Sequence, residues 1–371
     1  MERYRLGHAA ADDWREAADA CLDRLGAVPA EANLGFVYVT DHFAGELGAI
    51  VGRLEEATRV RQWVGSVGVG VCATGAEYFG RPAMAVMAAD FPEASFRVFD
   101  KVGEDLLRGA GASRGGGRDA PVFGVVHADP RSPDTPETIV RLADATGGFL
   151  VGGLTSSEGA YAQVAGRVTE GGISGVLFSP EVTVATGLSQ GCSPMGPVRR
   201  VTECFRNIAV QIDGRPALEV FKEDIGAELA SDLRRVAGYV YVAFLVKGSD
   251  TGDYLVRNLV GIDPEAGLIG VSEPLQPGDA IMFCRRDRES AEDDLRRMLR
   301  DLKRRVGGAK GGLYFSCVAR GPNLFGDQSE ELEAIRQELG EVPLVGFFCN
   351  GEISNNRLYG YTGVLTLFLS T

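Results

Sequence analysis

The sequence predicts a mixed α/β protein made of two similar halves, each a mixed sheet with flanking helices. Three observations lead to this prediction. The chain has 371 residues, which suits two domains of ordinary size. Runs of β-branched and apolar residues alternate with segments of helical periodicity. One order of these elements recurs late in each half, so we expect an internal duplication.

Composition and charge are those of a folded globular protein, with 45% apolar and 24% charged residues. The net charge of −13 repels the phosphates of nucleic acids and of anionic lipids. Neither a membrane span of roughly 20 apolar residues nor a signal peptide is recognisable, so we expect a cytoplasmic protein without nucleic-acid or membrane partners. The seven cysteines contain no CxxC pair, which favours reduced thiols.

The first half starts with an expected helical extension, residues 1–33. A β-branched and aromatic strand is predicted at residues 36–39. The helix expected at residues 42–57 has one apolar face, formed by Phe43, Leu47, Ile50 and Leu54. Further strands are predicted at residues 63–72, 83–89 and 95–99.

The order strand, helix, strand, loop, strand follows twice. Its first copy occupies residues 121–178, with the helix at 136–145, and its second occupies residues 313–365, with the helix at 329–339. The two copies align at one constant offset, which places Leu150, Val151, Gly152 and Glu158 opposite Leu344, Val345, Gly346 and Glu352. This agreement is the main evidence for a duplication.

The second half is expected to be rich in antiparallel strands. The strands are predicted at residues 239–246, 254–260, 267–271 and 279–283, and an amphipathic helix follows at 291–306. The boundary between the halves is expected near residues 207–234. We assign the first domain to residues 34–210 and the second to residues 211–371.

Small polar residues and glycine follow several predicted strands. Such loops can offer hydroxyls, thiols, backbone N–H groups and charges to a small ligand. The candidate ligand-binding residues are Cys72, Thr74, Thr155, Ser156, Ser157, Cys317, Arg320, Cys349, Asn350 and Glu352. Arg320 and Glu352 could bind the two ends of a zwitterion, or they could pair with each other. For the Ser/Thr residues the alternative is ordinary turn and cap chemistry.

Catalytic motifs give little support for an enzyme. No G-x-S-x-G elbow, P-loop, H-E-x-x-H or dinucleotide-binding G-x-G-x-x-G is present, which argues against nucleotide hydrolysis and hydride transfer. An acyl-transfer or hydrolase reaction remains an alternative, with Cys349, Cys317 or Ser156 as nucleophile and His127 as base. No catalytic residue and no metal ligand is assigned.

Three segments resemble the FIST family. The C-terminal stretch PLVGFFCNGEISNNRLYGYTGVLTLF, residues 343–368, is similar to the ending of the FIST_C domain, where a G-F-F-x-x-G-E-I segment precedes a final strand with T-G-V-L. Residues 315–321 (FSCVARG) and 191–197 (GCSPMGP) resemble further FIST patterns, and residues near 34–200 look like a FIST_N domain. The likeness covers nearly the whole chain.

The resemblance implies a sensory module of signal transduction that binds a small ligand, with amino acids as the suggested ligand class. No residues are left for an output domain, so it implies a stand-alone binder or an adaptor that works through a partner protein. Some family members resemble haem-based nitric oxide sensors. The haem alternative would need an axial ligand from His42, His127 or a cysteine. Otherwise no cofactor is expected.

Overall fold

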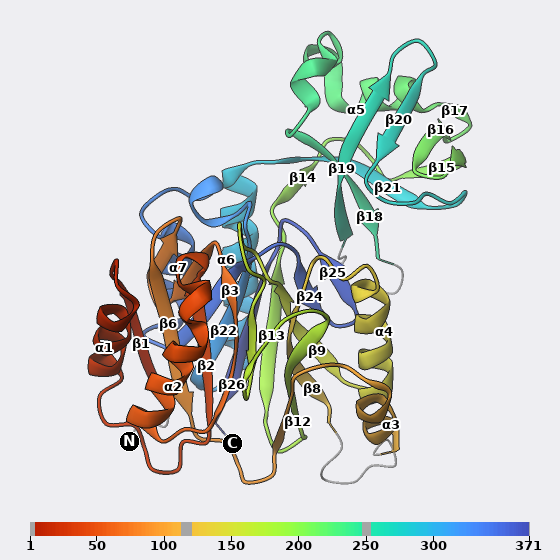
Figure 1. Ribbon diagram of the computed structural model, residues 1–371. Helices are drawn as coiled ribbons and strands as arrows, with labels where there is room; N and C mark the ends of the chain where they lie inside the picture. The colour runs from red at the N-terminus through yellow and green to blue at the C-terminus, as the bar shows by residue number, and fades with distance from the viewer. Residues whose placement is uncertain (1–3, 113–120, 247–253, 371) are drawn as a thin grey trace. The chain divides into compact units, whose positions relative to one another are not determined.

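The computed structural model describes residues 4–112, 121–246 and 254–370 (Figure 1). The chain divides into two compact units. Unit 1 consists of Met1–Ser189 and Leu295–Thr371, and unit 2 consists of Gln190–Asp294. The second unit is thus one continuous insertion into the sequence of the first.

Unit 1 contains, within the described ranges, three six-stranded sheets. The first has the order β1 (Arg5–Ala10), β6 (Ala83–Ala89), β2 (Leu34–Thr40), β3 (Gln62–Gly68), β10 (Gln163–Ala165), β11 (Val168–Thr169). The second has the order β25 (Arg357–Tyr359), β24 (Glu352–Ser354), β9 (Phe149–Leu154), β8 (Phe123–Ala128), β12 (Ile173–Phe178), β7 (Phe96–Phe99). The third has the order β13 (Val184–Ser189), β26 (Gly363–Leu369), β22 (Ala309–Cys317), β23 (Leu344–Cys349), β4 (Gly70–Ala73), β5 (Ala76–Phe79).

Each sheet is built on the same strand–helix–strand element. Two parallel strands, β2 and β3, β8 and β9, or β22 and β23, form its centre. The helices that connect them are α2 (Leu47–Thr58), α4 (Thr135–Thr146) and α7 (Glu330–Leu339). An antiparallel strand, β6, β12 or β26, pairs with the first strand of each element. The predicted duplication is confirmed, and residues 34–89 form a third copy that was not predicted.

A hairpin in each repeat pairs with the sheet of another repeat. Strand β4 of the first repeat pairs with β23 of the third, β10 of the second pairs with β3 of the first, and β24 of the third pairs with β9 of the second. The three sheets are therefore linked in a cycle. They share one buried core that contains Phe36, Val125 and Phe315, one residue from each sheet.

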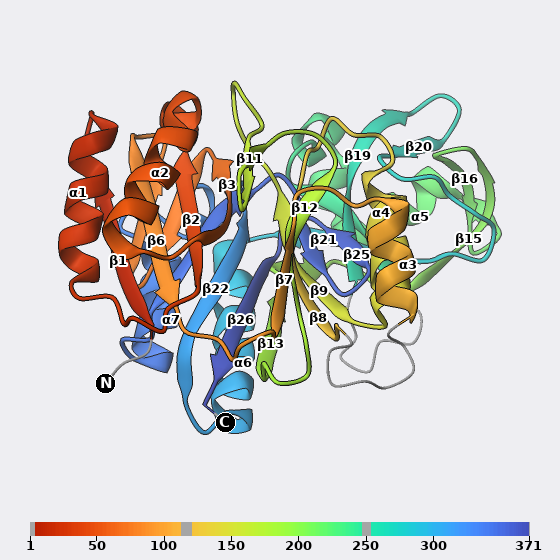
Figure 2. The same ribbon diagram turned by 60° about the horizontal axis from the view of Figure 1, so that its bottom comes forward.

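The remaining helices of unit 1 precede the parallel strand pairs. They are α1 (Trp14–Leu25), α3 (Glu104–Ala112) and α6 (Arg288–Arg305), which begins in unit 2. Helices α1 and α2 cover the outer face of the first sheet, and α3 and α4 cover that of the second (Figure 2). The core between these two helices and the sheet contains Cys21 of α1, Ile50 of α2 and Trp63 of β3, all fully buried.

The centre of each parallel pair has a glycine at the same position. Gly65, Gly152 and Gly346 lie opposite Val37, Val126 and Tyr314. A Cβ atom at these glycines would lie 1.6, 1.8 and 1.7 Å from the carbonyl oxygen of that opposite residue. Because the obstructing atom belongs to the backbone of a buried strand, no side-chain movement can make room. Glycine at this position is therefore a packing requirement of each repeat.

In the described residues of unit 2, antiparallel strands pack with the helix α5. The elements of this unit are β14 (Cys192–Pro194), β15 (Arg199–Phe205), β16 (Ile208–Ile212), β17 (Arg215–Pro216), α5 (Ala217–Ala230), β18 (Val240–Leu245), β19 (Tyr254–Asp263), β20 (Leu268–Val271) and β21 (Ala280–Arg286). The strands close into a ring because β18 pairs with both β19 and β21. Phe221 of α5 packs against Phe283 of β21 in the core, with ring centroids 4.8 Å apart.

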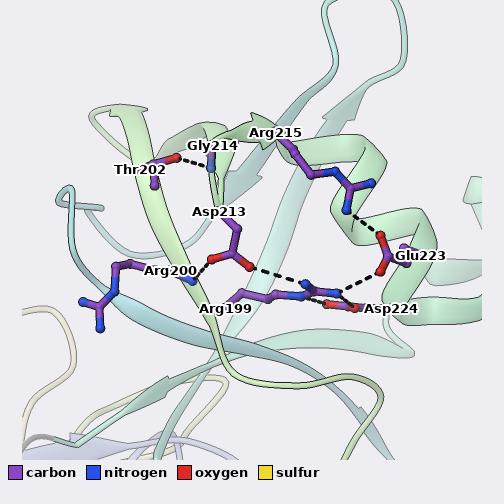
Figure 3. Close-up of polar contacts among 8 residues, drawn as sticks. All are labelled: Arg199, Arg200, Thr202, Asp213, Gly214, Arg215, Glu223 and Asp224. Atoms are coloured by element: carbon purple, nitrogen blue, oxygen red, sulfur yellow. Dashed lines mark hydrogen bonds and ion pairs between the residues drawn. The ribbon is translucent and has the colours of Figure 1, made fainter.

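A charged network fixes α5 to the hairpin of β15 and β16 (Figure 3). The guanidinium of Arg199 lies 2.5 Å from the buried Asp224 carboxylate and 3.4 Å from those of Asp213 and Glu223. Arg215 is paired with the second oxygen of Glu223 at 2.7 Å. Burial of the Arg199–Asp224 pair makes this contact stronger than an exposed ion pair. The network is a structural clamp of unit 2.

Several predicted elements differ from those observed. The strand expected at residues 63–72 is two strands, β3 and β4, separated at Val69. They belong to different sheets, because β4 begins the hairpin that pairs with the third repeat. The N-terminal segment contains α1 but also β1, which pairs with β6. The expected boundary at residues 210–211 lies within β16, inside unit 2.

Candidate functional site

The predicted polar loops after β9, β22 and β23 lie at the carboxyl ends of the parallel strands, whereas Thr74 lies in the turn between β4 and β5, beside the start of β23. Ser156, which follows β9, accepts a hydrogen bond from the Val69 N–H at 3.0 Å and donates its own to the Phe348 carbonyl. The hydroxyls of Ser66 and Thr155 are 2.8 Å apart. Residues of all three repeats thus meet here. The strand-end cluster is defined as Ser66, Thr155, Ser156, Cys317, Cys349 and Glu352.

Glu352 is the carboxyl group of the strand-end cluster, and one of its two oxygen atoms has no hydrogen-bond partner. Its Oε2 accepts hydrogen bonds from the Thr362 N–H at 3.1 Å and hydroxyl at 2.8 Å, whereas its buried Oε1 has no hydrogen-bond partner. Complete burial raises the pKa of Glu352 to about 8. The carboxyl group is therefore largely protonated and neutral at pH 7.

The two thiols of the strand-end cluster adjoin this carboxyl group. Cys317 and Cys349 lie opposite each other on β22 and β23, and both are buried. Burial raises the pKa of Cys349 well above the usual value of a thiol, and the neighbouring Glu352 acts in the same direction. A thiol of this kind is a poor nucleophile, because the reactive form is the thiolate.

His127, the predicted general base, lies at the centre of the core. It stands at the same repeat position as Tyr38 and Phe315, and the ring centroids of these residues are 5.5 and 6.2 Å from its own. Its Nε2 is 3.1 Å from the Tyr38 hydroxyl, and its buried Nδ1 has no hydrogen-bond partner. Burial lowers the pKa of His127 to about 3. Neither nitrogen is hydrogen-bonded to a predicted nucleophile, so the described residues contain no Cys–His or Ser–His dyad at this position.

The structure pairs Arg320 with a residue that was not predicted. Its guanidinium, fully buried, lies 2.7 Å from the carboxylate of Glu331 in the first turn of α7. The Tyr314 and Ser316 hydroxyls and the Gly321 N–H donate to the same carboxylate at 2.6, 3.0 and 3.0 Å. Arg320 thus forms its ion pair with Glu331, and its charge also opposes the rise in the pKa of Glu352. Its use as a carboxylate receptor would require exchange of Glu331 for the ligand.

The other predicted residues have local structural roles or are buried in strands. The Thr74 hydroxyl donates to Val342 O at 2.7 Å and accepts from Leu344 N at 3.0 Å. Beside Thr74 is a pocket of about 10 Å³, which holds no more than one water molecule. Ser157 accepts a hydrogen bond from the Gly159 N–H at 2.9 Å, which is the turn chemistry kept as the alternative. Cys72 is buried opposite Gly346, and Asn350 is exposed.

Glu77 and Glu331 are buried carboxyl groups that sequence reasoning missed. Glu77 lies on the exchanged hairpin of the first repeat, and its Oε1 accepts from the Leu332 N–H at 3.1 Å, which caps α7. Burial raises the pKa of Glu77 to about 8, and the nearby Glu331 adds to the effect. Glu331 stands between Glu330 and Glu333 in the sequence. Only its buried position distinguishes it from these two.

In the described ranges, His, Cys, Asp and Glu side chains form no group of three or more that could hold a metal ion. The ring of His127 is enclosed by Tyr38, Phe315 and Phe347, which leaves no room for a macrocycle at its nitrogens. His42 is exposed and lies 3.5 Å from the Asp41 carboxylate. In the same ranges, no helix has both the length and the apolar character of a membrane span.

The fold and the site define a mixed α/β protein of repeated strand–helix–strand elements with a buried, largely neutral polar cluster. Family models match nearly all of the chain, a FIST N domain at residues 33–215 and a FIST C domain at residues 217–355. The chain belongs to the FIST family, whose domains are small-ligand sensory modules. The boundary between the two matches, at residues 215–217, falls inside unit 2. In the sequence, unit 2 lies between β13 and the later part of α6, and so interrupts the third repeat.

Relatives align with this chain over different shares of their length. Uncharacterized proteins of Mycobacterium tuberculosis strains CDC 1551 / Oshkosh and ATCC 25618 / H37Rv are each 31% identical over 390 residues, covering 99% of this chain and 100% of the relative. An uncharacterized protein of Mycobacterium bovis is 31% identical over 244 residues, covering 63% of this chain and 62% of its own. These names assign no ligand.

The buried carboxyl groups predict how stability depends on pH. Between about pH 4.5 and 8 the folded state holds a proton on Glu352 that the unfolded state releases, so the free energy of unfolding should fall as pH rises through this range. Glu77 acts in the same direction. One pKa unit corresponds to about 1.4 kcal/mol. The difference in the free energy of unfolding between Glu352→Gln and wild type should therefore shift by a few kcal/mol in favour of the variant as the pH rises from 5 to 8.

Urea titrations of wild type and Glu352→Gln at several pH values measure this effect. The control is Glu333→Gln on the outer face of α7. Arg336 lowers the pKa of Glu333 to about 2, so this carboxyl group is ionised throughout the range. Its replacement should leave the decline in the free energy of unfolding above pH 5 unchanged. His127 has the opposite effect at low pH, because the unfolded state binds its proton below about pH 6.5 and the folded state does not. Identical pH profiles for wild type and Glu352→Gln would contradict a buried, protonated Glu352.

Proposed function

We propose that this protein is a sensory ligand-binding protein and that the strand-end cluster of unit 1 receives the ligand. The ligand class is an amino acid or a similar small polar metabolite. The observation that carries the proposal is the Oε1 atom of Glu352, a buried carboxyl oxygen without a hydrogen-bond partner among short polar side chains of three repeats. Buried polar atoms normally have partners, so an unsatisfied one supports a place for a ligand donor.

The chemistry of Glu352 suits the ammonium group of such a ligand. A cation next to a carboxyl group favours the ionised form, so binding would lower the pKa of Glu352 from about 8 and release its proton at neutral pH. The burial of the strand-end cluster requires that a surface loop moves before the ligand enters. Asn350 and Ser157 lie on loops at its rim, and each is at least partly exposed.

The output of the sensor belongs to the same proposal. In this proposal the signal passes to a partner protein, which recognises the loops that move when the ligand binds. We place the protein in the cytoplasm, where its free cysteines stay reduced and metabolites of this class are abundant.

Thermal unfolding in the presence of the common amino acids and related metabolites tests this function. A ligand at about one hundred times its dissociation constant stabilises the folded state by roughly 2.7 kcal/mol, which should raise the midpoint by several degrees. We expect one chemical class to give such a shift. Titration calorimetry in buffers of different ionisation enthalpy should then detect release of up to one proton per ligand at pH 7.

Two variants separate the site from the rest of the fold. Glu352→Gln preserves the shape of the side chain and should abolish both the midpoint shift and the proton release, whereas Glu333→Gln on the outer face of α7 should preserve both. A ligand that stabilises wild type and Glu352→Gln equally would place the binding site elsewhere. A preparation of the native protein, freed of co-purified ligand and unresponsive to every class, would contradict the sensory proposal.

A further inference from the structure

Unit 2 contains two cysteines that are diagonal neighbours on paired strands. Strand β14 pairs antiparallel with β21 in the register Cys192 opposite Arg286 and Pro194 opposite Cys284. Residues two apart on a strand face the same side of a sheet, so Cys192 and Cys284 are diagonal neighbours on one face. The interaction with Cys192 and burial raise the pKa of the Cys284 thiol.

Their surroundings keep the pair in place. Cys284 is fully buried, and Cys192 is 9% exposed. The Tyr254 hydroxyl donates to the Cys192 carbonyl at 2.9 Å, which fixes the short strand β14 beside β21. The backbone at both cysteines is thus held by a sheet ladder and a side-chain hydrogen bond, so the sulfur atoms cannot drift apart without loss of these contacts.

The position of the pair in the chain gives it a structural consequence. Cys192 lies two residues after Gln190, where unit 2 begins, and Cys284 lies on the last strand before α6 leads out of unit 2. A covalent bond between them would join the entry strand to the exit strand. It would enclose most of unit 2 in a single loop of the chain.

We infer that Cys192 and Cys284 are an oxidative modification site that forms a disulfide with a hydroperoxide as oxidant. The thiol of Cys192, the more accessible of the two, is oxidised to a sulfenic acid while the hydroperoxide ROOH is reduced to the alcohol ROH. The Cys284 sulfur then attacks the Cys192 sulfur, the S–S bond forms, and the hydroxyl leaves with the thiol proton as water. Two thiols and one hydroperoxide give one disulfide, one alcohol and one water.

The experiment treats the purified full chain with hydrogen peroxide, with and without later dithiothreitol. We expect a mass decrease of about 2 Da, a loss of two of the seven titratable thiols under denaturing conditions, and full reversal by the reductant. Peptide mapping of the oxidised wild-type protein should find Cys192 linked to Cys284. This measurement needs no variant, so it decides the question even where a substitution impairs folding.

Variants provide the matched comparison. Cys192→Ala and Cys284→Ala should each abolish the linkage, whereas Cys204→Ala, which removes a more exposed thiol of the same unit, should preserve it. A linkage between other cysteines, such as the opposed Cys317 and Cys349 of unit 1, would overturn the inference. Stepwise addition of oxygen to Cys192 without cross-linking, or no reaction of either thiol, would overturn it as well.

Discussion

Replacement of Glu331 by leucine is expected to lower the free energy of unfolding by about 3–5 kcal/mol. The change leaves the Arg320 guanidinium charged, fully buried and without the carboxylate that lies 2.7 Å from it. It also removes the acceptor of the Tyr314 and Ser316 hydroxyls. Urea titration of the variant against wild type measures the loss.

Two further variants identify the mechanism. Glu333→Leu alters a half-buried residue of the same helix that is paired with surface side chains, and it should change the free energy of unfolding by less than about 1 kcal/mol. The double variant Arg320→Met with Glu331→Leu removes the buried charge together with its partner and should recover part of the stability. Equal losses in the single and double variants would show that the buried charge is not the source of the effect.

Alanine at any of the three repeat glycines is expected to destabilise the protein by about 3 kcal/mol or more, at the upper end for overpacked cores. At Gly65, Gly152 and Gly346 the added Cβ would lie within 1.8 Å of a backbone oxygen of the adjacent parallel strand. Gly152 also has a φ of 144°, which alanine adopts only with strain. Thermal and urea unfolding of the three variants measure the loss.

The control for these variants is an open glycine. Gly52 lies on the exposed side of α2, and its Cβ would have no atom within 4 Å, so Gly52→Ala should stabilise the protein by about 0.5–1 kcal/mol through helix propensity. If Gly346→Ala were as stable as Gly52→Ala, the repeat glycines would not be a packing requirement. Similar losses at all three positions would support the equivalence of the three repeats.

The second and third repeats could be found in the sequence, whereas the first could not. Both late copies retain Leu-Val-Gly and a glutamate at the same distance, as in Leu150 to Glu158 and Leu344 to Glu352. The first copy shares only Val64 and Gly65 with them. The close approach of two parallel strands requires the glycine, whereas the neighbouring positions can hold different apolar residues. A two-residue match is too short to recognise among 50 glycines.

The positions of the residues in the strand-end cluster could be predicted from the sequence better than their contacts. Small polar residues after apolar strands are a local signal, and it led to Thr155, Ser156, Cys349 and Glu352, which do lie near one another. The partner of Arg320 was not predictable, because Glu331 carries the same charge and the same helical context as its neighbours. Burial alone selects it, and burial is set by elements distant in the sequence.

Most strands and helices of this protein, and the family motifs that it carries, could be predicted from the sequence alone. The exchange of hairpins between three repeats, the insertion of unit 2 and the contact of His127 with Tyr38 rather than a nucleophile emerged from the three-dimensional arrangement. The physical reason is that propensity and periodicity act over a few residues. Strand pairing, burial and the resulting pKa values instead depend on contacts between residues far apart in the chain.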